Sequence, residues 1–299
     1  MCRPTHQRGD PGGCSSSAAG RWSAWVSGPS VSTAASVRVR CAAMVEQPFR
    51  LVVIGDSTSF TDDTGPKLPN DKALYPNVLA ARIEAAVGRP VAVNVLARAG
   101  TDVREAWRLV AKDRHAQFEV LMGADAVVVG VGSIDHAPAG IPAIVETMIP
   151  FLRPESVRRI VRKNVYGAHP YLVRATAGRF THTAPAEFAR LYDSVLFQVR
   201  SLARGAAGVT LGPTSHRSRF YGKGHPTLRA REAMQREIAE RHGFPFVSAW
   251  DIVEPHADRL NPDGIHWPHT AHQEVAEALA DRLIAQVRGE AGRPQPPSF

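Results

Sequence analysis

The sequence predicts an α/β fold with a mainly parallel sheet. Short apolar runs of strand length alternate with longer amphipathic segments of helix length, which is the pattern of repeated βα units. The first run, Leu51–Ile54, contains three β-branched residues in four positions, which is typical of an inner strand covered on both faces. Strands joined by helices in this way pair in parallel through right-handed crossovers.

The first half of the chain repeats this alternation. A helix is predicted from about Leu74 to Val87, because its apolar residues recur every four positions and Gly88 follows as a stop. The second strand covers Val91–Leu96. A polar loop then leads to a helix that begins near Val103, and a third apolar strand is predicted over Ala126–Val131.

The second half opens with a long helical segment. Residues 138–204 are mostly helical, strongly apolar and longer than one crossover requires. They predict either plain helical packing or an inserted lid or pocket wall near the active site, and the pattern leaves both open. The remaining predicted elements are a strand at Val209–Leu211, a helix at about Thr227–His242, a strand at Phe246–Val247 and a helix at about Thr270–Val287.

The two ends of the chain differ in composition from its centre. Residues 1–43 are rich in Ser, Ala, Gly and Arg without helical or strand periodicity, which predicts a disordered or non-native extension. We expect the native protein to begin at or near Met44. The folded domain is predicted over 44–290, and 291–299 form a Pro-rich tail expected to be flexible.

Composition excludes several classes of function. The formal charge is +8, but about half of this excess lies in residues 1–43, and no basic helix with interleaved aromatic residues stands out, so we expect no nucleic-acid partner. No apolar run approaches the length of a membrane span. All three cysteines lie before Met44, which fits a reducing cytoplasm and excludes a cysteine nucleophile from the folded part.

A candidate nucleophile follows the first strand. The chain passes there through Gly55, Asp56 and Ser57, and the carboxyl ends of strands are where open α/β sheets bind ligands. Ser57 is therefore placed for nucleophilic catalysis. The alternative is a Ser/Thr-rich turn that caps a helix.

A candidate base lies near the C-terminus. Asp263 precedes His266 by three residues, just ahead of the last helix. A serine nucleophile needs a base, and the base needs a carboxylate that fixes its tautomer and stabilises the imidazolium. Alternatively, Asp263 sits in a turn and His266 packs. The other histidines match no metal-ligand spacing, so we expect no metal.

These motifs together resemble the SGNH (GDSL-type) hydrolases. Gly55-Asp56-Ser57 resembles that family's nucleophile block, Gly100 its glycine block and Asp263-x-x-His266 its C-terminal block. The resemblance implies a three-layer α/β/α sandwich, flavodoxin-like, with about five strands, and an acyl-serine mechanism. It also implies that the backbone N–H groups of Ser57 and Gly100 form the oxyanion hole. No Gly-x-Ser-x-Gly elbow is present, which argues against the ordinary α/β-hydrolase arrangement.

One block departs from the family pattern. Where the family has Gly-x-Asn-Asp, this chain has Gly132-Ser133-Ile134-Asp135, so the asparagine that would donate to the oxyanion is replaced by Ile134. Losing one such donor can cost about 2.7–4 kcal/mol of transition-state stabilisation. Either the backbone donors suffice, or Ser133 or His136 substitutes.

The residues around Ser57, from Gly55 to Asp63, and the long helical segment also resemble those of a group of actinobacterial acyltransferases of methylglucose lipopolysaccharide synthesis. This implies transfer of octanoyl from octanoyl-CoA, through Ser57, to a diglucosylglycerate acceptor, with acyl-CoA as a substrate and no cofactor. A plain esterase or thioesterase, or an inactive carbohydrate-binding scaffold, remain alternatives. Candidate substrate-binding residues are Arg217, Arg219, Lys223 and Trp267. The sequence carries no signal for an oligomeric state.

Overall fold

The computed structural model describes residues 47–142, 145, 148–222, 224 and 226–289. The predicted N-terminal extension (1–43) and the predicted tail (291–299) lie outside the described residues. Among the residues it does describe, no helix combines the length and apolarity needed to cross a bilayer.

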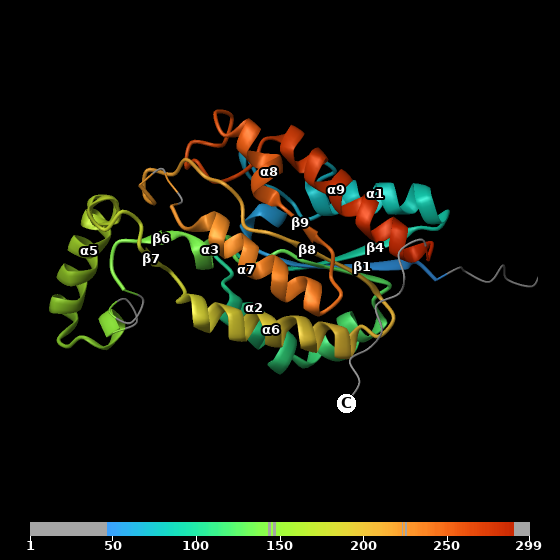
Figure 1. Cartoon of the computed structure of the whole chain (residues 1–299), viewed down its shortest axis with the longest axis horizontal. Coiled ribbons are helices and arrows are strands. Elements are labelled where there is room, and N and C mark those ends of the chain that lie inside the picture. The colour runs from blue at the N-terminus through green and yellow to red at the C-terminus, as the bar shows by residue number, and fades with distance from the viewer. Residues whose placement is uncertain (1–46, 143–144, 146–147, 223, 225, 290–299) are drawn as a thin grey trace, which may run out of the picture. The chain divides into compact units, whose positions relative to one another are not determined.

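The centre of the fold is a five-stranded parallel sheet (Figure 1). The strand order is β4-β1-β5-β8-β9, so the strand that carries the nucleophile motif lies inside the sheet. The crossover from β1 to β4 and back to β5 gives the switch in strand order at which α/β sheets bind ligands. The strands are β1 (Phe49–Gly55), β4 (Val91–Ala97), β5 (Ala126–Val129), β8 (Ala207–Leu211) and β9 (Phe246–Val247).

Helices cover both faces of the sheet, which confirms the predicted three-layer α/β/α sandwich. Along β1, Leu51 and Val53 join the apolar core on one face, whereas Val52 and Ile54 join the core on the other. This alternation follows from the two-residue period of a strand. The first face is covered by α1 (Tyr75–Val87), α8 (Ala249–Val253) and α9 (His269–Val287), and the second by α2 (Val103–Lys112), α6 (Pro185–Leu202) and α7 (Leu228–Arg241).

The long helical segment divides into two parts with different surroundings. Helix α6 packs on the sheet through Phe188 and Tyr192, both fully buried, so it belongs to the sandwich. Helix α5 (Glu155–Ala175) lies apart from the layers, beyond β6 and β7 (Figure 1). The predicted packing therefore describes α6, whereas α5 is the part that extends from the sandwich.

Short elements connect these layers, and most lie at the carboxyl ends of the strands. They are η1 (Ser57–Ser59), β2 (Thr61–Asp62), β3 (Gly65–Pro66), η2 (Ala116–Val120), η3 (Leu121–Gly123), α3 (Ser133–His136), β6 (Pro138–Ala139), η4 (Ile149–Phe151), β7 (Phe180–Thr181) and η5 (Glu254–His256). The third strand ends at Val129, two residues earlier than predicted, because the chain turns through Gly132 at a φ of 124° into α3.

Candidate active site

Ser57 opens the short helix η1 directly beyond β1. The carboxylate of Asp56 caps this helix by accepting hydrogen bonds from the Thr58 N–H at 2.9 Å and the Thr58 hydroxyl at 2.8 Å. Burial raises the pKa of Asp56, although the Thr58 hydrogen bonds and the nearby His266 oppose that shift. The cap thus fixes the turn from which the Ser57 hydroxyl projects.

His266 and Asp263 form a chain of hydrogen bonds with Ser57. The Nε2 atom of His266 lies 3.0 Å from Ser57 Oγ, although the two residues are 209 positions apart in sequence. On the other side of the ring, Nδ1 lies 2.9 Å from Asp263 Oδ2. The structure therefore brings together the three residues that the sequence predicted, in the geometry that nucleophile, base and orienting carboxylate require.

The turn that carries these residues is held by its own hydrogen bonds. The side-chain oxygen of Asn261 accepts from the backbone N–H groups of Ile265 at 3.2 Å and His266 at 3.1 Å. Gly264 has a φ of +74°, and a Cβ there would lie 2.6 Å from the carbonyl carbon of Arg217. Only glycine fits this close approach. Sequence analysis missed Asn261, although an asparagine that begins a Pro-Asp-Gly turn is a signal for such bonds.

Asp263 is held in its ionised form. Partial burial raises its pKa, but hydrogen bonds from Asn261 and the Ile265 N–H, together with the adjacent His266, outweigh this and lower the pKa below its ordinary value. The His266 side chain is 13% exposed and that of Asp263 44%. A carboxylate that stays charged can orient the ring and stabilise an imidazolium.

Trp267 lies in the core, which corrects its prediction as a substrate-binding residue. Its side chain is 1% exposed, and its indole N–H donates to the Thr214 hydroxyl at 2.9 Å. Its ring centre lies 6.0 Å from that of Tyr75 and 5.3 Å from that of His272. Because no face of the indole reaches solvent, Trp267 packs in the core and does not contact a substrate.

Gly100 lies in the turn after β4, at the same edge of the sheet as Ser57. Gly55 and Ala97 are paired across β1 and β4, so the segments that follow these two strands leave the sheet side by side. Gly100 is exposed, has a φ of +72° and has open space where a Cβ would be. The turn suits the predicted oxyanion-donor role, which stays a prediction.

The candidate substitutes for the missing asparagine occupy different surroundings. His136 is 1% exposed and packs against Phe188, with 4.2 Å between ring centres. Burial lowers the pKa of His136 to about 3. Because both ring nitrogens are sealed from solvent, His136 cannot donate to an oxyanion in this conformation, and that prediction was wrong. Ser133 is half-buried, and its hydroxyl accepts from the Thr214 N–H at 3.3 Å; Ile134 beside it is also half-buried.

The cationic residues predicted to bind substrate have different surroundings. The guanidinium of Arg217 forms an ion pair with Glu254, so its charge is already compensated, and its backbone N–H donates to the Gly264 carbonyl at 2.7 Å. Through this hydrogen bond to Gly264, Arg217 stabilises the turn that contains Asp263. Arg219 is exposed on the same loop, and Lys223 lies outside the described residues.

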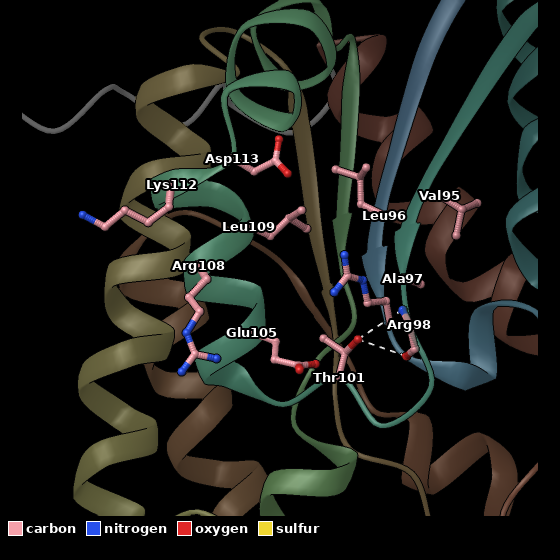
Figure 2. A pocket seen from close by; sticks show the side chains of 10 residues that line it. All are labelled: Val95, Leu96, Ala97, Arg98, Thr101, Glu105, Arg108, Leu109, Lys112 and Asp113. Atoms are coloured by element: carbon pink, nitrogen blue, oxygen red, sulfur yellow. Dashed lines mark hydrogen bonds between the residues drawn. The ribbon is translucent and has the colours of Figure 1, made fainter.

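A groove of about 600 Å³ runs between β4 and α2 (Figure 2). It begins at Arg98 and Thr101, in the loop that contains Gly100, and continues over Leu96 and Leu109. Ser57, Asp263 and His266 do not line this groove. Figure 2 shows Arg108 and Lys112 on the outer side of α2, pointing away from the strands.

Residues 53–274 match the GDSL-like lipase/acylhydrolase family. The chain belongs to this family. The family relationship that the sequence motifs indicated is thereby confirmed, and it spans the strand of Ser57, the predicted glycine block and the His266 turn. Within the described residues, no group of three or more His, Cys, Asp or Glu side chains is gathered as metal ligands; the expected absence of a metal stays a prediction.

Two relatives of this GDSL-like chain are named as acyltransferases. The diglucosylglycerate octanoyltransferase of Mycolicibacterium hassiacum is 30% identical over 253 residues, which cover 82% of this chain and 96% of that protein. The diglucosylglycerate octanoyltransferase of Mycobacterium tuberculosis is 27% identical over 249 residues, covering 82% of this chain and 94% of that one.

Solved structures agree with the fold. A carbohydrate acetylesterase family member from Sinorhizobium meliloti superimposes with a TM-score of 0.52 at 14% identity, over 80% of this chain and 99% of that one. At this identity the likeness supports the architecture of a GDSL-like protein and leaves the substrate open.

Proposed function

We propose that the chain is a serine acyltransferase that moves an octanoyl group from acyl-CoA to a glucosylglycerate-type acceptor through an acyl-Ser57 intermediate. The observation that carries the proposal is the hydrogen-bonded series Ser57–His266–Asp263, at 3.0 and 2.9 Å. The names of the two relatives support the choice of the octanoyl group and of the acceptor. Acyl-CoA as donor places the proposed reaction in the cytoplasm.

In the first half-reaction, Ser57 Oγ attacks the thioester carbonyl while His266 Nε2 takes its proton. The carbonyl oxygen becomes an oxyanion, for which the backbone N–H groups of Ser57 and Gly100 are the proposed donors. The carbon–sulfur bond then breaks, His266 returns the proton to the departing thiolate, and the octanoyl group remains as an ester on Ser57.

In the second half-reaction, a sugar hydroxyl replaces the thiol. His266 removes the proton of this hydroxyl, whose oxygen attacks the acyl-Ser57 carbonyl, and the proton passes to Ser57 as the product ester leaves. Asp263, kept ionised, stabilises the imidazolium in both halves. Fully burying the octanoyl tail would contribute on the order of 5 kcal/mol of binding, so we expect an apolar surface beside Ser57.

Intact-mass measurement after mixing the protein with octanoyl-CoA tests the first half. We expect a species heavier by one octanoyl group in the native protein and none in Ser57→Ala. The matched control is Ser194→Ala on α6, whose hydroxyl bonds only the backbone carbonyl of Arg190 and which should acylate normally. Acylation of Ser57→Ala would contradict the assignment of the nucleophile.

Release of CoA with and without acceptor tests the second half. We expect diglucosylglycerate to accelerate CoA release and to appear as its octanoyl ester. Family membership favours hydrolysis as the second candidate function, in which water deacylates Ser57. Equal rates with and without acceptor, together with free octanoate as the sole acyl product, would select the hydrolase. Failure of both acylation and turnover would select the carbohydrate-binding alternative.

A further inference from the structure

Helix α5 and the preceding η4 carry large apolar side chains that stay exposed among the described residues. Within the part of the chain that the structure describes, twelve large apolar side chains are exposed, and seven of them lie between residues 145 and 171. On η4 and α5 themselves, the most exposed are Phe151 at 78%, Tyr171 at 71% and Ile160 at 59%. We call the exposed side chains of η4 and α5 the α5 surface. Exposed apolar side chains gathered on neighbouring elements mark an interaction site.

The α5 surface is also strongly basic. Helix α5 carries one carboxylate, Glu155, against five cations, which are Arg158, Arg159, Arg162, Lys163 and Arg174. The sequence predicted no basic helix with interleaved aromatic residues, and α5 corrects that prediction. Its Tyr166 and Tyr171 lie among these cations, and the Arg162 guanidinium stands 5.8 Å from the Tyr166 ring centre.

The uncovered face is distinct from the face by which α5 is anchored. The buried side holds His169 and Val173, and the His169 ring stacks on Phe220 at 4.2 Å between centres. Val157, Ile160 and Tyr171 lie at offsets of three and fourteen residues, which places them on one stripe of a helix, turned away from the anchored side. The helix therefore has an apolar stripe that does not pack against the sandwich.

We propose that the α5 surface binds an anionic lipid membrane, with its cations at the headgroups and its apolar side chains at the boundary of the acyl chains. A basic amphipathic helix with protruding apolar and aromatic side chains has the composition of an interfacial helix, which lies on a bilayer without spanning it. A lipid surface supplies negative charge and an apolar layer together, which matches both properties of the α5 surface. Docking by α5 would turn the α3 end of the sandwich, where the strands end, toward the membrane (Figure 1).

Vesicle flotation of the full chain tests this proposal. Vesicles of phosphatidylcholine alone are compared with vesicles of phosphatidylcholine and phosphatidylglycerol. We expect at least tenfold more protein bound to the anionic vesicles, and loss of most of that binding at 0.5 M salt, since salt screens exposed charges. Ser57→Ala should bind like the native chain, so the result does not depend on the proposed chemistry.

Paired variants separate this surface from overall charge. Arg159→Glu with Lys163→Glu reverses two exposed cations four residues apart on α5 and should reduce binding at least tenfold. The control, Arg108→Glu with Lys112→Glu, reverses an exposed pair of the same spacing on α2 and should stay within twofold of native binding. A second pair tests the apolar part: Ile160→Ser should weaken binding severalfold, whereas Phe118→Ser, also exposed, should not.

Three outcomes would overturn the proposal. They are absence of binding to anionic vesicles, equal losses in the α5 and α2 variants, and a stable dimer that the α5 variants dissociate while vesicles leave it intact. The last would assign the α5 surface to a second copy of the chain. In the first case, where vesicles do not bind, capture of an acidic protein would assign the α5 surface to a protein partner.

Discussion

The carboxylate of Asp135 accepts a hydrogen bond from the backbone N–H of Val103 at 2.9 Å. Asp135 lies on α3, whereas Val103 begins α2 three residues after Gly100. The other oxygen of Asp135 accepts from the Thr183 hydroxyl at 2.5 Å. One buried side chain therefore joins the loops that follow the second and third strands, and so fixes the proposed oxyanion donor Gly100 relative to α3.

Replacing Asp135 with Asn should change how stability depends on pH. Burial, with a smaller contribution from Asp102, raises the pKa of Asp135 from 3.8 to about 7. The folded chain thus binds this proton more tightly than the unfolded chain, and the free energy of unfolding falls as pH rises from about 4 to about 7. Across that window Asp135→Asn should gain about 2–4 kcal/mol relative to the native chain. Urea unfolding at several pH values measures it. Asp281→Asn, at an exposed site, should show no such trend; a flat difference for Asp135→Asn would contradict the shift.

Asp263→Asn should lower kcat by about 10²–10⁴-fold while the fold persists. An amide at this position can favour the wrong tautomer of His266 and cannot stabilise the imidazolium. Because the side chain is 44% exposed, the free energy of unfolding should change by less than about 1 kcal/mol. Steady-state CoA release and thermal unfolding give the two values. Native-like kcat would remove Asp263 from the proposed mechanism.

Gly100→Ala and Gly88→Ala form a matched pair. Both glycines have a positive φ, +72° and +73°, and neither has a neighbour where a Cβ would be. Each change should therefore cost about 1–2 kcal/mol of stability from backbone strain alone. Only Gly100→Ala should also reduce kcat, because Gly100 follows β4 at the sheet edge where β1 leads to Ser57, whereas Gly88 ends α1. Parallel losses of kcat in the two variants would show that general destabilisation is the cause.

Thr214→Val should destabilise the chain by about 1–3 kcal/mol, because it leaves the buried indole N–H of Trp267 without its acceptor. Thr214→Ser keeps the hydroxyl and should retain most of the stability. Since Trp267 is sealed in the core, KM for octanoyl-CoA should stay within about twofold in both variants. A large rise of KM in stable protein would restore a substrate role for Trp267.

Ile134→Asn should raise the rate of acyl-Ser57 hydrolysis by about tenfold or more, since it restores the amide donor that the family motif supplies. Ile134→Leu, similar in volume and apolar, should leave the rate unchanged. Burst kinetics with octanoyl-CoA in the absence of acceptor would measure deacylation by water. Equal rates in both variants would show that this side chain does not reach the oxyanion.

The sequence determined what depends on local patterns. Continuous apolar runs specified the strands, and apolar residues that recur every four positions specified the helices. Short motifs identified Ser57, Asp263 and His266, because such turns need particular residues at fixed spacings. Tertiary structure decided what depends on contacts between distant segments. The 3.0 Å approach of Ser57 to His266, the burial of His136 and Trp267 and the Asp135–Val103 bond arise only when strands far apart in sequence lie side by side. The same holds for α5, because the sequence left open whether this segment packs on the sheet or extends from it, and the fold placed it apart from the sheet. A periodic pattern fixes which side chains share a face, whereas only the packed chain decides what covers that face.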